Sequence, residues 1–430
     1  MNQYPFPKKS WTGSVFGLFL FAMLLLARDT LITSVKLGFY KSQFLMLALI
    51  GLLFVIFLVY NRRNLRAIVA DRRMLVMAVF AAILLLPMLV KRDWQIMYLS
   101  ILLCLLFPVF LTYFTDYCTV ARYYVGILTA LSAYSVIATY LFRQLVWAGV
   151  LQVPVCVNDA GMEFYDFLLC FGVTDPFWHR NFGIFREPGV YQFFLLLGLY
   201  LNHYAVSWRK ETTRWLVSAL LVITMFTTYA IGGFIETGLF AVFVYFEKKY
   251  YRGKLGRWLG VSVIVAMVAA VGFLLIRMRM PGFAASPLYE LYDMFIRLTT
   301  DSESLVDRFS AIFTDVKFFV KNPLTGAKIA PVLHGTNHNT SSTLVLYAIL
   351  GFFGGTLHIA TWVALLWKKE RNVIANLILL GIFLMSFNTQ NLTADVFFWL
   401  FPCMALIQRG LPFLKLPMKG EKTDGKGIAS

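Results

Sequence analysis

Apolar runs of about 17 to 25 residues recur along this chain from Ser14 to Gln408, and each is long enough to cross a hydrocarbon core of roughly 30 Å as an α-helix. A helix satisfies every backbone donor and acceptor within its own segment, as a lipid environment requires. Hydrophobic residues make up 59% of the 430 residues and charged residues only 14%, so the chain is too apolar to fold as a water-soluble globule. The sequence predicts an all-α fold: a polytopic transmembrane helical bundle, with residues 1–430 forming a single integral membrane domain.

The hydropathy pattern predicts about twelve spans. The expected spans are Trp11–Ala27, Phe44–Tyr60, Met74–Val90, Met97–Phe114, Tyr123–Phe142, Val190–Ser207, Trp215–Ile231, Gly233–Phe246, Trp258–Ile276, Ser342–Trp367, Val373–Phe387 and Thr393–Gln408. Two connections are long, residues 143–187 and residues 277–341, and residues 409–430 form a tail. Long connections between well-formed elements are unusual unless they are functional.

Both long connections are expected to be partly helical. In the first, the aromatic stretch Phe164–Phe171 is expected to lie along the membrane surface as a short helix. In the second, Leu305–Val320 has apolar residues at helical spacing, and Pro323–Gly326 predicts the turn that ends the helix.

Basic residues in the short loops predict the orientation, because such loops face the cytoplasm. The two most basic short loops lie after the second and eighth expected spans and contain Arg62, Arg63, Arg66, Arg72 and Arg73, and Lys248, Lys249, Arg252, Lys254 and Arg257. With an even number of spans, both termini are then cytoplasmic and both long loops are outside.

Some positive charge falls on the outer side despite this rule, including Arg28, Lys36, Lys91 and Arg92. It reflects either ordinary variation in topology with contacts to lipid headgroups, or an anionic substrate bound at the outer surface. Although the formal net charge is +17, nucleic-acid binding is not expected, because no soluble basic domain is predicted.

The first long loop contains Cys156 and Cys170. They either form a disulfide in an oxidising compartment or remain free thiols. The five cysteines of the chain do not form a metal-binding set.

The first candidate constellation is Arg180, Arg186 and Glu187, directly before an expected span. Arginine presents a fixed fork of donors that suits pyrophosphate oxygens. Pro188 fits the first turn of the following helix, and Glu187 falls at its positive end. The alternative is a plain interfacial anchor, in which the arginine side chains extend to the membrane surface and Glu187 neutralises them.

The second constellation is Arg308, His334 and His338 in the second long loop. A neutral imidazole near pH 7 can accept a proton from an attacking hydroxyl. The spacing matches no zinc pattern, because Gly335 and Asn337 argue against a helix through both histidines. The alternative is that these histidines are simply solvated.

Within the spans, Glu236 and Asp395 are candidates because carboxyl groups in membrane segments are usually functional. His358 lies near Gly351, Gly354 and Gly355, where close packing of helices is the simpler explanation. No glycine-rich nucleotide loop, Ser-His-Asp order or Asp-rich metal motif occurs, so neither a metal nor another cofactor is expected.

At these residues the chain resembles the O-antigen ligase and polymerase superfamily of bacterial envelope proteins. The resemblance is carried by Arg180-x-x-Gly183-x-Phe185-x-Glu187-Pro188, Arg308 on an amphipathic helix, Asn322-Pro323-Leu324-x-Gly326, and His338-Asn339 before Gly351-x-x-Gly354. It implies metal-independent glycosyl transfer from a polyprenyl-diphosphate-linked oligosaccharide, on the periplasmic face of the bacterial inner membrane. Membrane lipid and a chain-length regulator are the candidate partners.

The same resemblance assigns roles to individual residues. Arg180, Arg186 and Arg308 are expected to hold the diphosphate, and His338 is expected to be the base on the acceptor side. Glu187, His334 and Glu236 complete the set expected around the substrate.

One interval departs from the ligases of this superfamily. Eleven residues, Thr340 to Leu350, separate Asn339 from Gly351, which is longer than usual in ligases and favours a repeat-unit polymerase. The spacings after Arg180 and Arg308 do not reproduce the arginine-glycine interval of some polymerases, so a ligase stays an alternative. A lipid-linked oligosaccharide flippase or transporter and a non-catalytic scaffold are the others; charge gathered at the outer ends rather than along the spans favours an enzyme.

Overall fold

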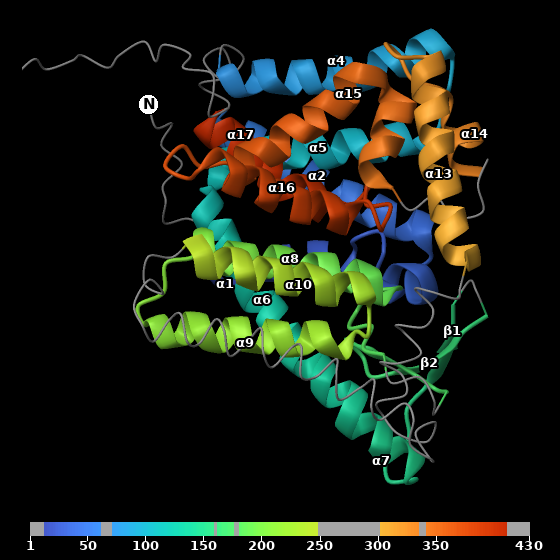
Figure 1. Cartoon of the computed structure of the whole chain (residues 1–430), viewed down its shortest axis with the longest axis vertical. Helices are drawn as coiled ribbons and strands as arrows, with labels where there is room; N and C mark the ends of the chain where they lie inside the picture. The colour runs from blue at the N-terminus through green and yellow to red at the C-terminus, as the bar shows by residue number, and fades with distance from the viewer. Residues whose placement is uncertain are drawn as a thin grey trace, which may run out of the picture.

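The computed structural model describes residues 13–61, 71–158, 161–175, 180–247, 302–334 and 341–410. In these ranges the chain is a bundle of helices with one small sheet (Figure 1). The elements are α1 (Gly13–Leu25), the π-helix η1 (Ile32–Leu37), α2 (Phe39–Asn61), α4 (Arg72–Lys91), α5 (Ile96–Phe114), α6 (Tyr117–Ile137), the π-helix η2 (Ala138–Phe142), α7 (Arg143–Trp147), β1 (Val155–Val157), β2 (Glu163–Asp166), β3 (Phe171–Val173), α8 (Pro188–Tyr204), α9 (Glu211–Thr227), α10 (Ile231–Glu247), α13 (Ser302–Lys321), α14 (Ile329–His334), α15 (Ser342–Leu366), α16 (Val373–Phe387) and α17 (Val396–Arg409).

The helices follow the expected spans closely. Every expected span in the described ranges overlaps a helix, and Trp258–Ile276 lies outside them. Among the described residues, four helices are long and apolar enough to cross a membrane by length and composition: Arg73–Lys91, Ile96–Phe114, Tyr117–Trp147 and Ser342–Leu366. The chain is therefore mostly helical and compatible with a helical membrane protein, while the count of twelve spans stays a prediction.

Several helices begin where a polar side chain accepts a hydrogen bond from the first turn. Asp71, Asp116, Ser341, Asn372 and Asp395 cap the N-termini of α4, α6, α15, α16 and α17 in this way. Such side chains satisfy backbone N–H groups that have no partner within the helix. The sequence thus marks the helix starts even where the flanking residues are apolar.

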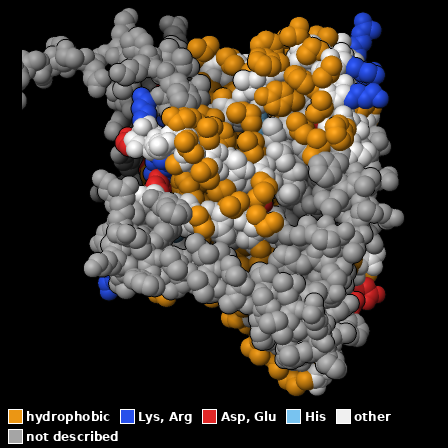
Figure 2. All heavy atoms as spheres, in the orientation of Figure 1, with side chains coloured by type: hydrophobic (Ala, Val, Ile, Leu, Met, Phe, Trp, Pro, Cys, Tyr) orange, Lys and Arg blue, Asp and Glu red, His pale blue; other side chains and the backbone are white. Residues whose placement is uncertain are grey.

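Apolar side chains cover the outer faces of α4 and α16. Leu75, Leu86 and Val90 on α4, and Ile374 and Leu377 on α16, are each more than half exposed. Figure 2 shows a broad apolar surface on this face of the described residues, with Lys, Arg, Asp and Glu at its margins. A surface of this kind is what a lipid-facing helix presents.

The first long loop folds differently from the prediction. Phe164–Phe171, expected as a surface helix, instead contributes β2 and the start of β3 to an antiparallel sheet of order β1-β2-β3, with Tyr165 opposite both Val155 and Gly172. An eight-residue stretch is too short to form a stable helix alone, and its aromatic residues favour strands. The prediction of an all-α fold was therefore wrong for this segment.

The sheet has its own small core. Phe164, Phe171 and Val173 pack with Leu31 and Phe182. All five cysteines of the chain, including Cys156 and Cys170, are free thiols.

The bundle has two distinct ends. The end at the right of Figure 1, called the loop end here, carries β1, β2, α13 and α14 from both long connections. The starts of α8, α10, α15 and α17 lie there, as the contacts of their first residues show. The described parts of the two long connections thus lie at the same end of the bundle. That the two whole loops share one side of a membrane, and which side faces the cytoplasm, stay predictions.

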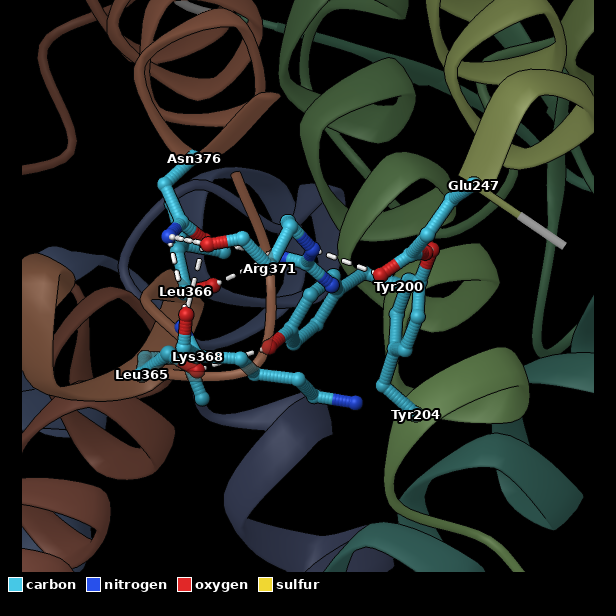
Figure 3. A network of polar contacts seen from close by, with 8 residues as sticks. All are labelled: Tyr200, Tyr204, Glu247, Leu365, Leu366, Lys368, Arg371 and Asn376. Atoms are coloured by element: carbon cyan, nitrogen blue, oxygen red, sulfur yellow. Dashed lines mark hydrogen bonds and ion pairs between the residues drawn. The ribbon is translucent and has the colours of Figure 1, made fainter. Parts of the chain in front are cut away.

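A buried ion pair joins four helices at the opposite end (Figure 3). Arg371, in the α15–α16 connection, donates from Nε to Glu247 Oε1 of α10 at 2.6 Å and from Nη1 to the Leu366 carbonyl at 2.9 Å. The hydroxyl of Tyr204 at the end of α8 donates to the other carboxylate oxygen of Glu247. Asn376 of α16 accepts from Arg371 Nη1 at 3.2 Å. The network therefore fixes the ends of α8, α10, α15 and α16 to one another.

Candidate functional site

The loop that carries Arg180, Arg186 and Glu187 is held by hydrogen bonds from several elements. Asn181 Nδ2 donates to Ser135 Oγ of α6 and to Thr227 Oγ1 of α9, both at 3.0 Å. Its backbone N–H donates to the Thr227 carbonyl at 2.9 Å, and its Oδ1 accepts from Gly183 N at 2.9 Å. Residue 181 therefore ties the start of the loop to two helices of the bundle.

The other side of the loop pairs with the connection after α1. Leu31 N donates to the Ile184 carbonyl and Arg186 N to the Asp29 carbonyl, both at 2.8 Å. Gly183 has φ +55°, and a Cβ atom there would lie 2.6 Å from the Tyr191 ring. Glycine is required here for both reasons. Phe171 N of β3 also donates to the Gly183 carbonyl at 3.0 Å. The backbone before α8 is thus fixed from α6, α9, β3 and the α1 connection.

Arg186 and Glu187 keep partly exposed side chains on this fixed backbone. The α8 helix begins at Pro188 and Glu187 is its N-cap residue, as predicted. Arg186 Nη2 lies 3.5 Å from Glu187 Oε1, and the two side chains are 39% and 47% exposed. An exposed ion pair contributes little free energy, so a phosphate group could compete with Glu187 for the guanidinium group.

A buried carboxyl group next to Arg186 was not predicted from the sequence. Asp29 is 8% exposed, and its Oδ2 atom has no hydrogen-bond partner among the described residues. Burial raises the pKa of Asp29, while Arg28 and Arg186 act in the opposite direction. Asp395, named above as a candidate, is close enough for its charge to interact with Asp29 and Arg28. We call Arg28, Asp29, Arg186, Glu187 and Asp395 the loop-end charge cluster.

An apolar pocket of about 480 Å³ lies between the sheet and the α6–η2–α7 helix. Its lining is apolar except for Asp166 and the hydroxyl of Tyr134: Tyr134, Phe142, Leu145, Leu151, Val153, Pro154, Asp166, Phe167 and Leu168. Asp166 is paired with Lys36 Nζ at 2.7 Å. The pocket therefore suits a hydrocarbon group rather than a charged one.

Glu236 is completely buried in α10, where it is the sixth residue of the helix. Among the described residues neither of its carboxylate oxygens makes a hydrogen bond of normal geometry, although the hydroxyl group of Ser386 of α16 lies nearby. Gln192 of α8 lies beside it: a Cβ atom on Gly232 would be 2.8 Å from Gln192 Nε2 and 3.5 Å from Glu236 Oε1. Its expected role in substrate binding stays a prediction, because its oxygens are covered in this conformation.

Two motifs that carry the family resemblance meet in space. Gly351 breaks α15 with φ 67° and ψ −164°, and the Asn322–Gly326 turn after α13 lies against this break. A Cβ atom on Gly351 would overlap the Leu324 carbonyl, and one on Gly326 would overlap the backbone of Ile349. Gly326 and Gly351 are therefore explained by close packing of the two backbones, which holds α13 on α15.

The remaining predicted site residues are only partly described. Arg308 lies on α13 and His334 is the last residue of α14, but their side chains are outside the description, as is residue His338 altogether. Arg180, Arg186 and Glu187 thus lie on one loop, and Arg186 and Glu187 pair with each other, at the end of the bundle that also carries α13 and α14. The convergence of Arg308 and His338 on this loop stays a prediction.

Comparisons of the chain with protein families, with curated proteins and with solved structures find no match.

Proposed function

We propose that the protein transfers an oligosaccharide from a polyprenyl diphosphate donor on the outer leaflet, and thereby polymerises repeat units of O-antigen or another surface polysaccharide. The observation that carries the proposal is the loop before α8. Its backbone is fixed by bonds from several elements, and it holds two arginines whose side chains stay partly exposed.

The proposed reaction breaks the bond between the anomeric carbon and the diphosphate oxygen, and forms a bond from that carbon to an acceptor hydroxyl oxygen. Guanidinium groups stabilise the negative charge that develops on the leaving diphosphate, a role proposed for Arg180, Arg186 and Arg308. His338 is proposed to accept the proton of the attacking hydroxyl. A loop with a fixed backbone suits this chemistry, because the reacting groups must be held in line.

The apolar pocket supports a lipid-linked donor. The connection after α1 contacts both places: Lys36 of η1 pairs with Asp166 at the pocket, and Leu31 N donates to the Ile184 carbonyl in the arginine loop. An apolar pocket and partly exposed guanidinium groups at the same end of the bundle suit a substrate that has a hydrocarbon chain and a phosphate head.

The net charge of the loop-end charge cluster determines which further arginines the proposal requires. Two arginines and three carboxyl groups give the loop-end charge cluster a formal charge of −1, or zero when Asp29 is protonated. The cluster alone has no excess of positive charge for a diphosphate. The proposal therefore requires Arg180 and Arg308 to contribute as well as Arg186.

The experiment is repeat-unit transfer in proteoliposomes that contain a polyprenyl-diphosphate-linked oligosaccharide. Arg186→Ala is expected to lower the rate by about 100-fold, which is typical for the loss of one donor to a developing negative charge. Arg209→Ala, which removes an exposed arginine at the opposite end, is the matched control and should polymerise normally.

Normal chain lengths with Arg186→Ala would contradict the proposal. Transfer of preformed chains to a lipid A core acceptor, without addition of repeat units, would instead identify a ligase. Movement of the lipid-linked sugar across the bilayer without formation of a glycosidic bond would identify a flippase.

A further inference from the structure

The break in α15 exchanges helix hydrogen bonds for bonds to the turn after α13. In an uninterrupted helix the N–H of Phe352 would donate to the carbonyl of Ala348. Here Phe352 N donates to the Pro323 carbonyl at 2.7 Å, and the Ala348 carbonyl accepts from Ala327 N at 2.6 Å. Both groups of the lost helix bond therefore have new partners, as backbone groups within a membrane protein must.

Lys91, the last residue of α4, completes this exchange. Its Nζ atom donates to the Ile349 carbonyl of α15 at 2.6 Å and to the Ala327 carbonyl at 2.8 Å. The ammonium group also lies 5.2 Å from the centre of the Tyr98 ring. Two residues on, Asp93 Oδ2 accepts from Ile329 N at 2.8 Å. The end of α4 thus binds the broken helix and the α13–α14 connection at the same time.

These contacts between the turn after α13, the broken helix α15 and Lys91 lie at the C-terminal end of α13; we call them the α13–α15 joint. The α13 helix ends at Lys321, directly before the bound turn, and Arg308 lies about 20 Å further along its axis. A tilt of α13 by about 5° would move Arg308 by about 2 Å, and an error of about 1 Å in a reacting group can cost on the order of 100-fold in rate.

We propose that Lys91 is a positioning residue for Arg308: by bridging the carbonyls of Ala327 and Ile349, it fixes the angle of α13 at the substrate. The role in catalysis rests on the proposed function, whereas the bridge itself does not. It also accounts for a lysine on the outer side of the bundle without either topological variation or direct contact with substrate.

The first test measures the position of α13 without reference to activity. Spin labels at Ser310 on α13 and at Trp94, both exposed, would be placed in a chain with Cys118 and Cys156 changed to Ser. Lys91→Met is expected to broaden or shift the label distance by about 2 Å or more. Lys91→Arg, which keeps a cation with several donors, should restore it, and Lys328→Met, an exposed lysine in the same connection, should leave it unchanged. An unchanged distance in Lys91→Met would overturn the bridge.

The second test separates positioning from general destabilisation. Lys91→Met is expected to lower kcat for repeat-unit transfer by about tenfold or more, with Lys91→Arg recovering most of it. In a double-mutant cycle, Lys91→Met combined with Arg308→Ala should be no slower than Arg308→Ala alone, because Lys91 acts through Arg308. Additive losses would overturn the positioning role. A wild-type protein without transfer activity would remove the proposed function and that role with it, while the label distance still decides the bridge.

Discussion

The protonation of Asp29, which lies in the connection after α1, should depend on the fold. Because its pKa is raised by burial, the folded state binds the proton more tightly than the unfolded state. The stability gained from protonation is complete below the ordinary pKa of 3.8 and is lost as the pH rises through the raised pKa. Asp29→Asn resembles the protonated form, so it should raise the apparent Tm by about 1 to 3 °C near pH 8, with a difference that disappears near about pH 4.

Asp71 gives a control of opposite sign in the same melting experiment. Burial alone would raise the pKa of Asp71, but hydrogen bonds from Arg73 outweigh it and hold the pKa below its ordinary value. Its contribution to stability is therefore present above the ordinary pKa and is lost as the pH falls through the lowered one. Asn can still cap α4, so Asp71→Asn removes only the negative charge that pairs with Arg73. The variant should therefore lower the apparent Tm near pH 8. If both variants shift Tm in the same direction at that pH, the assignment of Asp29 as a destabilising buried carboxyl is wrong.

Single residues could be predicted only where a local pattern marks them. Glu187 and Pro188 were placed correctly at the start of α8, because the signals for a helix start lie next to one another in the sequence. Asp29 and Lys91 could not be recognised, because their partners are more than 150 residues away: Arg186 for Asp29, and Ala327 and Ile349 for Lys91. The sequence around a carboxylate or ammonium group beside a span does not say which distant residue will contact it, because that depends on how the helices pack.

At the scale of elements, the joint between α13 and α15 gives a direct prediction. Gly351→Ala should lower stability by about 3 kcal/mol or more, because a Cβ atom would overlap the Leu324 carbonyl in a backbone conformation with φ 67°. The measurement is unfolding of the detergent-solubilised protein. Gly381→Ala in α16 is the control, because a Cβ atom there meets nothing within 4 Å, and it should be neutral or slightly stabilising. Equal stabilities of the two variants would mean that the joint does not hold the fold.

How well each helix or strand could be predicted depends on the periodicity and the length of its apolar residues in the sequence. Long apolar runs determined the helices well, and Leu305–Val320 was correctly read as the amphipathic helix now seen as α13. Phe164–Phe171 was misread because strand pairing is a non-local property, which depends on Val155–Val157 and on the buried Leu31 and Phe182. The break within α15 could not be predicted either, because a glycine at position 351 is also compatible with a continuous membrane helix. Only the turn packed against α15 requires a break there.

At the scale of the whole molecule, the sequence predicted that the two long loops share one side, and the described parts of both loops lie at the loop end (Figure 1). The prediction depends only on the number of apolar runs, because successive spans alternate in direction; the count of twelve spans itself stays a prediction. The arrangement of helices around the axis was not predictable. Contacts between α6, α8 and α9 bring Ser135 and Thr227 to Asn181, in the loop before α8. Hydropathy carries no information on which helices are neighbours.

The end away from the loops should depend on the Arg371–Glu247 pair in Figure 3. The Arg371 side chain is 4% exposed and that of Glu247 is 21% exposed, so removing either one leaves the other charge without its main partner in a poorly hydrated place. Arg371→Met and Glu247→Leu should each destabilise the protein by about 3 to 5 kcal/mol, and the double variant should lose less than the sum, because it leaves no unpaired charge. Lys369→Met, next to the network but exposed, should change stability by less than about 0.5 kcal/mol. If the two single losses simply add in the double variant, the pair does not act as a unit, and the ends of α8, α10 and α16 are joined by apolar packing alone.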